Sequence, residues 1–113
     1  MATDVTIAEN LEGKAVSFIV RNEDGSLDDL TTYDTVRFII SKIDYSAGVL
    51  VNRTQADPEI TVDASGKLIW TPSAAQPGPA FGKYLVQIIR EEAGVDKPTM
   101  TWTLEALRRA PII

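Results

Sequence analysis

The sequence predicts an all-β fold from two features. Apolar and polar residues alternate with period two over several short segments, which is the pattern of half-buried strands. Clusters of Gly, Pro, Asp and Asn separate these segments at regular intervals, where turns are expected. Six or seven such segments in 113 residues favour an immunoglobulin-like antiparallel β-sandwich. A jelly roll or a small barrel is the alternative.

The first two predicted strands cover residues 15–21 and 35–43, and each places three apolar residues on one face. Those residues are Val16, Phe18 and Val20 in the first strand and Val36, Phe38 and Ile40 in the second. The loop between the strands opens with Asn-Glu-Asp-Gly at residues 22–25, where glycine supplies the positive φ that tight turns often use. We therefore expect two strands joined by a polar loop.

Shorter strands follow in the middle of the chain. Residues 49–53 form a brief apolar segment, and residues 59–62 and 67–71 flank the turn Asp-Ala-Ser-Gly at 63–66. The last two segments therefore predict a hairpin, with Leu68 and Trp70 buried. The next stretch, residues 72–82, is rich in Pro and Gly, so we expect an irregular crossing between sheets.

Two alternating segments near the C-terminus, residues 83–91 and 98–104, predict a terminal hairpin around residues 92–97. Their apolar faces carry Tyr84, Val86 and Ile88 in the first and Met100, Trp102 and Leu104 in the second. One domain over residues 1–113 is expected, because no linker divides the chain. We expect a short flexible segment up to about residue 10 and a tail from about residue 106.

Composition excludes several functional classes. The formal charge of −5 and the pI near 4.6 oppose binding to nucleic acid or to anionic membranes. Cysteine and histidine are both absent, which removes the commonest nucleophile pairs, general base and metal ligands. We therefore expect a protein that is not an enzyme and has no cofactor, catalytic residue or metal site. No export signal or membrane-spanning run is evident, so a soluble protein made in the cytoplasm is expected.

Acidic clusters are the remaining candidates for chemistry. Residues 22–29 contain enough oxygen ligands to suggest calcium, but their spacing does not match an EF-hand loop, and a solvated turn is the favoured interpretation. The pair Asp57 and Glu59 and the pair Glu91 and Glu92 are alternatives for acid–base chemistry. Strand ends are usually acidic for solubility, so no catalytic role is predicted.

Several strands carry apolar residues on both faces, although the outer face of a monomeric sandwich should be mostly polar. Either loops cover these second-face residues or they form an interface with another subunit, and both possibilities stay open. They are Ile19, Ile39, Ile69, Leu85 and Ile89. Further contact candidates are the loop aromatics Tyr33, Tyr45 and Phe81 and, at the end of the tail, Ile112 and Ile113.

Three segments, in this order, resemble motifs of a known family. A strand is followed by Asn-Glu-Asp-Gly-Ser-Leu-Asp-Asp-Leu-Thr at 22–31 and Val-Arg-Phe at 36–38. Asp-Ala-Ser-Gly-Lys-Leu then occupies 63–68, and Gly-Lys-Tyr occupies 82–84. Over roughly residues 15–105 this order resembles the N-terminal domain of bacteriophage baseplate upper proteins. Ser26, Asp28 and the proline-rich loop depart from the family pattern.

The resemblance implies an immunoglobulin-like module of a phage virion that binds other virion proteins and copies of itself through sheet faces and edge strands. It carries no catalytic residues with it. The expected location is the virion, in the tail, baseplate, connector or capsid decoration. The alternative is a carbohydrate- or receptor-binding module that uses Tyr33, Tyr45, Phe81 and loop carboxylates.

Overall fold

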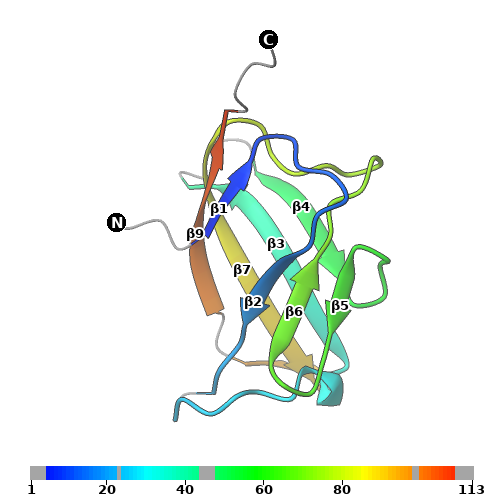
Figure 1. The fold of residues 1–113 in the computed structure, drawn as a ribbon. Helices are drawn as coiled ribbons and strands as arrows, with labels where there is room; N and C mark the ends of the chain where they lie inside the picture. Colours follow the sequence, from blue (N-terminus) through cyan, green and yellow to red (C-terminus); the bar gives the residue numbers. More distant parts are fainter. Residues whose placement is uncertain (1–4, 23, 44–47, 98–99, 109–113) are drawn as a thin grey trace.

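The computed structural model of the chain describes residues 5–22, 24–43, 48–97 and 100–108. Over these residues the chain forms nine strands in two sheets and one short 3-10 helix, η1, at Leu30–Thr32, with no α-helix (Figure 1). The prediction of an all-β fold is confirmed.

The larger sheet has six strands in the order β1-β9-β7-β3-β4, with β8 paired to the end of β7. Its strands are β1 (Val5–Ala8), β3 (Thr35–Lys42), β4 (Val49–Thr54), β7 (Gly82–Glu92), β8 (Val95–Asp96) and β9 (Met100–Leu107). The smaller sheet has the order β2-β6-β5 and contains β2 (Val16–Ile19), β5 (Ile60–Val62) and β6 (Lys67–Trp70). All strand pairs are antiparallel except β1 with β9, which run parallel.

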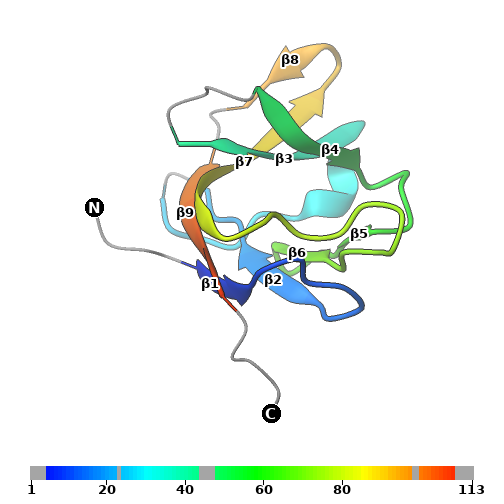
Figure 2. The same cartoon turned by 90° about the horizontal axis from the view of Figure 1, so that it is seen from above.

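The core fills the space between the two sheets, which lie face to face (Figure 2). Its centre is a series of aromatic rings that alternates between the sheets. Trp70 of β6 packs on Phe38 of β3, Phe38 packs on Phe18 of β2, and Phe18 meets the edge of Trp102 of β9, with centroid separations of 5.2, 5.4 and 5.3 Å. Such tilted and edge-on arrangements suit the ring quadrupoles.

The predicted alternation within strands matches the burial observed. The predicted inward residues of 15–20, 35–40 and 84–88 are all buried except Val16, which is half-buried. The hairpin of β5 and β6 and the pairing of β7 with β9 also form as expected. Leu68 and Trp70 are fully buried, whereas Met100 and Trp102, near the side of the sandwich, are half-buried.

The two ends of the domain differ from expectation. Residues 5–8, expected in a flexible segment, form β1, because Ile7 is buried and the strand gains a partner in residues 104–107. Ala106 and Leu107, expected in the tail, belong to β9 for the same reason. Strand β8 has only two residues, too few for alternation to identify, and β1 lies in the segment expected to be flexible, so the strand count exceeds the predicted six or seven.

The loop after β2 packs on the turn between β5 and β6. The Leu30 N–H donates to the Asp63 carbonyl at 3.2 Å, and the Asp28 N–H donates to the Val20 carbonyl at 3.1 Å. Gly66 completes the turn with φ of +79°, and a Cβ at this position would lie 2.5 Å from the Val20 carbonyl oxygen. The close approach of two backbones therefore requires glycine here.

Candidate functional site

Three of the five predicted second-face residues lie together on the outer face of the larger sheet. Leu85 and Ile89 are outward residues of β7, and Ile39 lies on β3 opposite Gln87, between them along the sheet. All three are half-buried. We call Ile39, Leu85 and Ile89 the outer stripe.

Polar side chains border the outer stripe on both sides. Leu85 lies between Ser41 of β3 and Thr103 of β9, and both of these are buried. On the β4 side, Arg37 Nη1 donates to Asn52 Oδ1 at 2.7 Å. The smaller sheet covers only the opposite face of the larger sheet, and no second layer of described strands covers the stripe (Figure 2). The result is a sheet face on which three half-buried apolar side chains lie among hydrogen-bonding groups, and such a mixed surface suits contact with another protein.

Ile19 and Ile69 lie elsewhere. They are outward residues of β2 and β6, on the outer face of the smaller sheet, where Ile69 is flanked by Ser17 and Thr61. Ile19 is 39% exposed, and Ile69 is half-buried. The predicted interface residues are therefore divided between two opposite faces of the sandwich, since alternation identifies a second face but not the sheet to which a strand belongs.

The predicted aromatic contact residues do not gather. Tyr33 is buried and donates its hydroxyl to Asp28, so its prediction as a partner contact is corrected. Phe81 is 52% exposed and lies at the other end of β7, with the Arg108 guanidinium 4.6 Å from its ring centre. Tyr45, Ile112 and Ile113 lie outside the described residues.

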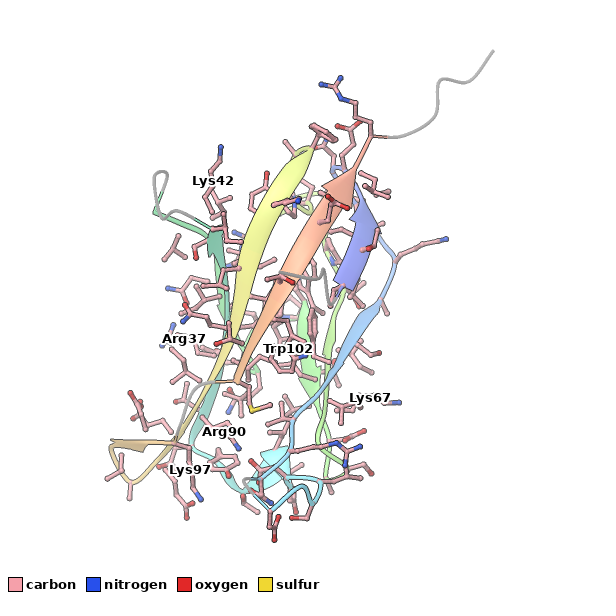
Figure 3. The ribbon with its side chains drawn as sticks, turned by 90° about the vertical axis from the view of Figure 1, so that its left-hand side faces the viewer. Arg37, Lys42, Lys67, Arg90, Lys97 and Trp102 are labelled. Atoms are coloured by element: carbon pink, nitrogen blue, oxygen red, sulfur yellow. The ribbon has the colours of Figure 1, made fainter. Side chains whose placement is uncertain are left out.

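A buried ion pair that the sequence analysis did not identify ties the loop after β2 to β7. Arg90 Nη1 lies 2.5 Å from Asp28 Oδ2, and the Tyr33 hydroxyl donates to the same oxygen at 2.7 Å. All three side chains are buried, and Figure 3 shows Arg90 and Lys97 at the end of the molecule that holds this loop. The alternation of β7 places Arg90 on the inward face, two residues after Ile88. A charged residue at an inward position is the sequence signal that could have identified this ion pair.

The acidic clusters make separate local contacts. Asp24 accepts from the Ser26 N–H, Asp29 accepts from the Thr31 N–H, and Asp28 faces Arg90. Glu23 lies outside the described residues, and within those residues no group of three carboxylates converges to hold a metal.

The second acidic cluster surrounds a cation. Arg53 lies 3.9 Å from Asp57 and 3.8 Å from Glu59, and Glu59 also accepts from the Ser73 hydroxyl at 2.9 Å. Asp57 accepts from the Thr54 N–H at 2.8 Å, at the end of β4. These carboxylates stabilise the end of β4 and the turn that follows it.

A groove of about 440 Å³ runs between β1 of one sheet and β2 of the other. Ile7, Ala8, Leu11 and Val16 supply apolar lining, and Thr6, Lys14, Ala15 and Ser17 complete the groove. We call it the edge groove, because each flanking strand lies at the edge of its sheet.

We expect stability to fall above pH 10. Burial, and then the hydrogen bond to Asp28, raise the pKa of Tyr33, and burial raises the pKa of Tyr84. Both groups therefore stabilise the fold fully below the unfolded tyrosine pKa of about 10, and this contribution is lost as pH rises toward the higher folded pKa. Urea unfolding followed from pH 8 to 11 measures the decline. Tyr33→Phe should make it shallower, and an unchanged slope in that variant would contradict the assignment.

Comparisons with family models, curated proteins and solved structures found no significant match. Among the described residues, no helix is long and apolar enough to cross a bilayer.

Proposed function

We propose that this chain is a bacteriophage virion structural protein, an immunoglobulin-like module that binds other virion proteins and copies of itself. Its role is assembly, and its place is the virion, in the tail, baseplate, connector or capsid decoration. The observation that carries the binding role is the outer stripe, a sheet face that combines apolar side chains with a hydrogen-bonding border. The motif resemblance carries the phage assignment.

The strand order supports the immunoglobulin-like part of the proposal. A three-stranded sheet, β2-β6-β5, faces a larger sheet in which β4 extends β9-β7-β3, and this order resembles part of a variable-type immunoglobulin sandwich. Near the start of β7, the Tyr84 hydroxyl donates to the carbonyl of Ala80, four residues upstream, at 2.7 Å. A tyrosine at this corner with the same backward hydrogen bond is a hallmark of such domains.

The packing of two motifs supports the resemblance. The segment 22–31 lies against the turn 63–66, through the contact of Leu30 with Asp63 and the approach of residue 28 to Gly66. Because these two segments pack against each other, they form one structural unit. The occurrence of both motifs in the family's order therefore supports the resemblance more strongly than two unrelated turns would.

Aspartate replacements in the outer stripe test the binding role. We expect Leu85→Asp and Ile39→Asp to leave the fold intact, because both side chains point away from the core, and to abolish self-association or incorporation into particles. A charge buried at an apolar contact without a partner costs several kcal/mol, about the amount needed to lose such an interface. Light scattering coupled to size exclusion measures self-association, and recovery of tagged protein in purified virions measures incorporation.

Ile69→Asp provides the matched control, because it places the same charge at a half-buried position on the opposite face. Assembly should survive this change. Normal assembly by Leu85→Asp and Ile39→Asp together would refute the role of the stripe.

A further inference from the structure

The smaller sheet has an open edge at β2. The Val20 N–H donates to the Gly66 carbonyl at 2.7 Å, and this bond fixes which residues of β2 direct their backbone groups toward β6. Because antiparallel ladders bond at every second residue, Val16 and Phe18 bond toward β6, while the N–H and C=O groups of Ser17 and Ile19 point away from it. Among the described residues, no side chain or loop bonds to these outward groups.

The edge of the larger sheet at β4 is different, because side chains and a turn cover it. The Gln76 amide donates to the Leu50 carbonyl at 3.4 Å, and both backbone groups of Thr54 bond to Asp57. Proteins commonly protect their edge strands in such ways. The open edge of β2 thus contrasts with a protected edge in the same molecule.

The edge groove lies beside the open edge of β2. Its other wall is β1, where the Glu9 N–H bonds to the Leu107 carbonyl at 2.8 Å, so that Thr6 and Ala8 direct their backbone groups away from β9. Ile7, Leu11 and Val16 supply apolar lining. In the immunoglobulin-like order the smaller sheet has a fourth strand next to the one represented by β2, and the described residues place none there.

The charges along the β2 edge favour a strand with acidic ends over a second copy of this chain. Lys14 and Arg21 flank β2, both are exposed, and no acidic residue lies between them, although the whole chain has a formal charge of −5. Antiparallel pairing of β2 with a second copy, centred on Phe18, would place Lys14 of one copy near Arg21 of the other. Like charges in neighbouring positions across strands are destabilising, whereas carboxylates at both ends of an incoming strand would be attracted.

We propose that the open edge of β2 accepts an extended strand from a different protein, with apolar side chains directed into the edge groove and acidic residues at its ends. Main-chain bonds to Ser17 and Ile19 supply the pairing, as in other cases of strand addition. The inference names a partner class for the proposed assembly module, and it rests on that function and its immunoglobulin-like strand order.

A peptide titration tests the inference. The probe is Asp-Thr-Val-Thr-Val-Thr-Val-Asp, added to isotopically labelled protein, with amide hydrogen exchange followed by NMR. We expect the amides of Ser17 and Ile19 to become protected, while those of Leu50 and Asn52 on β4 do not. The same peptide with lysine at both ends should bind roughly tenfold more weakly, since two attractive pairs become repulsive.

Two variants test separately the backbone pairing and the charge preference. Ser17→Pro removes an outward N–H without removing a bond to β6, so it should abolish peptide binding in the folded protein. Lys14→Glu changes an exposed side chain and should remove the preference between the acidic and lysine-ended peptides, because Arg21 still attracts a carboxylate at one end while the new carboxylate repels it at the other.

The inference would be overturned by no protection of Ser17 and Ile19 at millimolar peptide, by protection of the β4 edge instead, or by equal binding of both peptides. Protection that rises with protein concentration alone would assign the edge to a second copy and equally refute it. Leu85→Asp should leave peptide binding unchanged, because it lies on the other sheet. Failure of the edge inference is thereby separated from failure of the outer stripe.

Discussion

Asp28→Ala should destabilise the protein by about 3 to 5 kcal/mol, as expected when one partner of a buried ion pair is removed. The substitution takes the carboxylate away from Arg90, which is 3% exposed, and the acceptor away from the Tyr33 hydroxyl. It also releases the loop after β2 from β7, because this ion pair joins residues 62 positions apart. Urea unfolding followed by circular dichroism measures the loss.

Asp29→Ala is the control for Asp28→Ala. The Asp29 carboxylate accepts from the Thr31 N–H at the start of η1, and removal of such a cap costs about 1 kcal/mol. A double-mutant cycle with Arg90→Met then isolates the pair, and the double variant should be more stable than Asp28→Ala alone. Equal losses in Asp28→Ala and Asp29→Ala would show that the buried charge pair has no special weight.

Trp70→Ala should cost about 3 to 5 kcal/mol, because the indole is 1% exposed and packs against Phe38 in the series of rings between the sheets. Its removal leaves a cavity next to the Phe38 ring, and β6 is too short to collapse into it without losing its pairing with β2 and β5. Thermal and urea unfolding monitored by circular dichroism provide the measurement.

Trp102→Ala provides the comparison within the same ring series. The Trp102 side chain touches Phe18 but is half-buried, so its loss should cost about half as much as the loss of Trp70. Figure 3 shows Trp102 near the side of the sandwich, between β9 and β2. If Trp102→Ala is less stable than Trp70→Ala, the best-packed part of the core lies at the Trp102 end of the ring series, and this prediction is wrong.

Alternation in the sequence was sufficient to identify the longer strands and their inward residues. Val36, Phe38 and Ile40 on β3 and Tyr84, Val86 and Ile88 on β7 are buried as expected, because burial on one face requires apolar residues at every second position. Strands β1 and β8 escaped the same reasoning. Strand β8 has only two residues, and β1 forms because β9 offers it a parallel partner almost one hundred residues later.

The candidate surfaces were predicted only in part. Ile39, Leu85 and Ile89 were identified as second-face apolar residues, and they do lie together. Tyr33 was expected to contact a partner, because a loop aromatic between polar residues resembles an exposed side chain in sequence. Its hydroxyl instead reaches Asp28 inside the fold, through a loop whose course depends on Arg90 and the turn at Gly66.

The sequence by itself determined which residues face inward on the long strands, where the turns lie, and that the fold is all-β. These properties depend on period-two alternation and turn chemistry, which act over a few neighbouring residues. Only the tertiary structure decided which strands share a sheet, and hence that the outer stripe and Ile19 lie on opposite faces and that β2 has an open edge. Strand pairing joins residues far apart in the chain, and many pairings are compatible with the same local pattern.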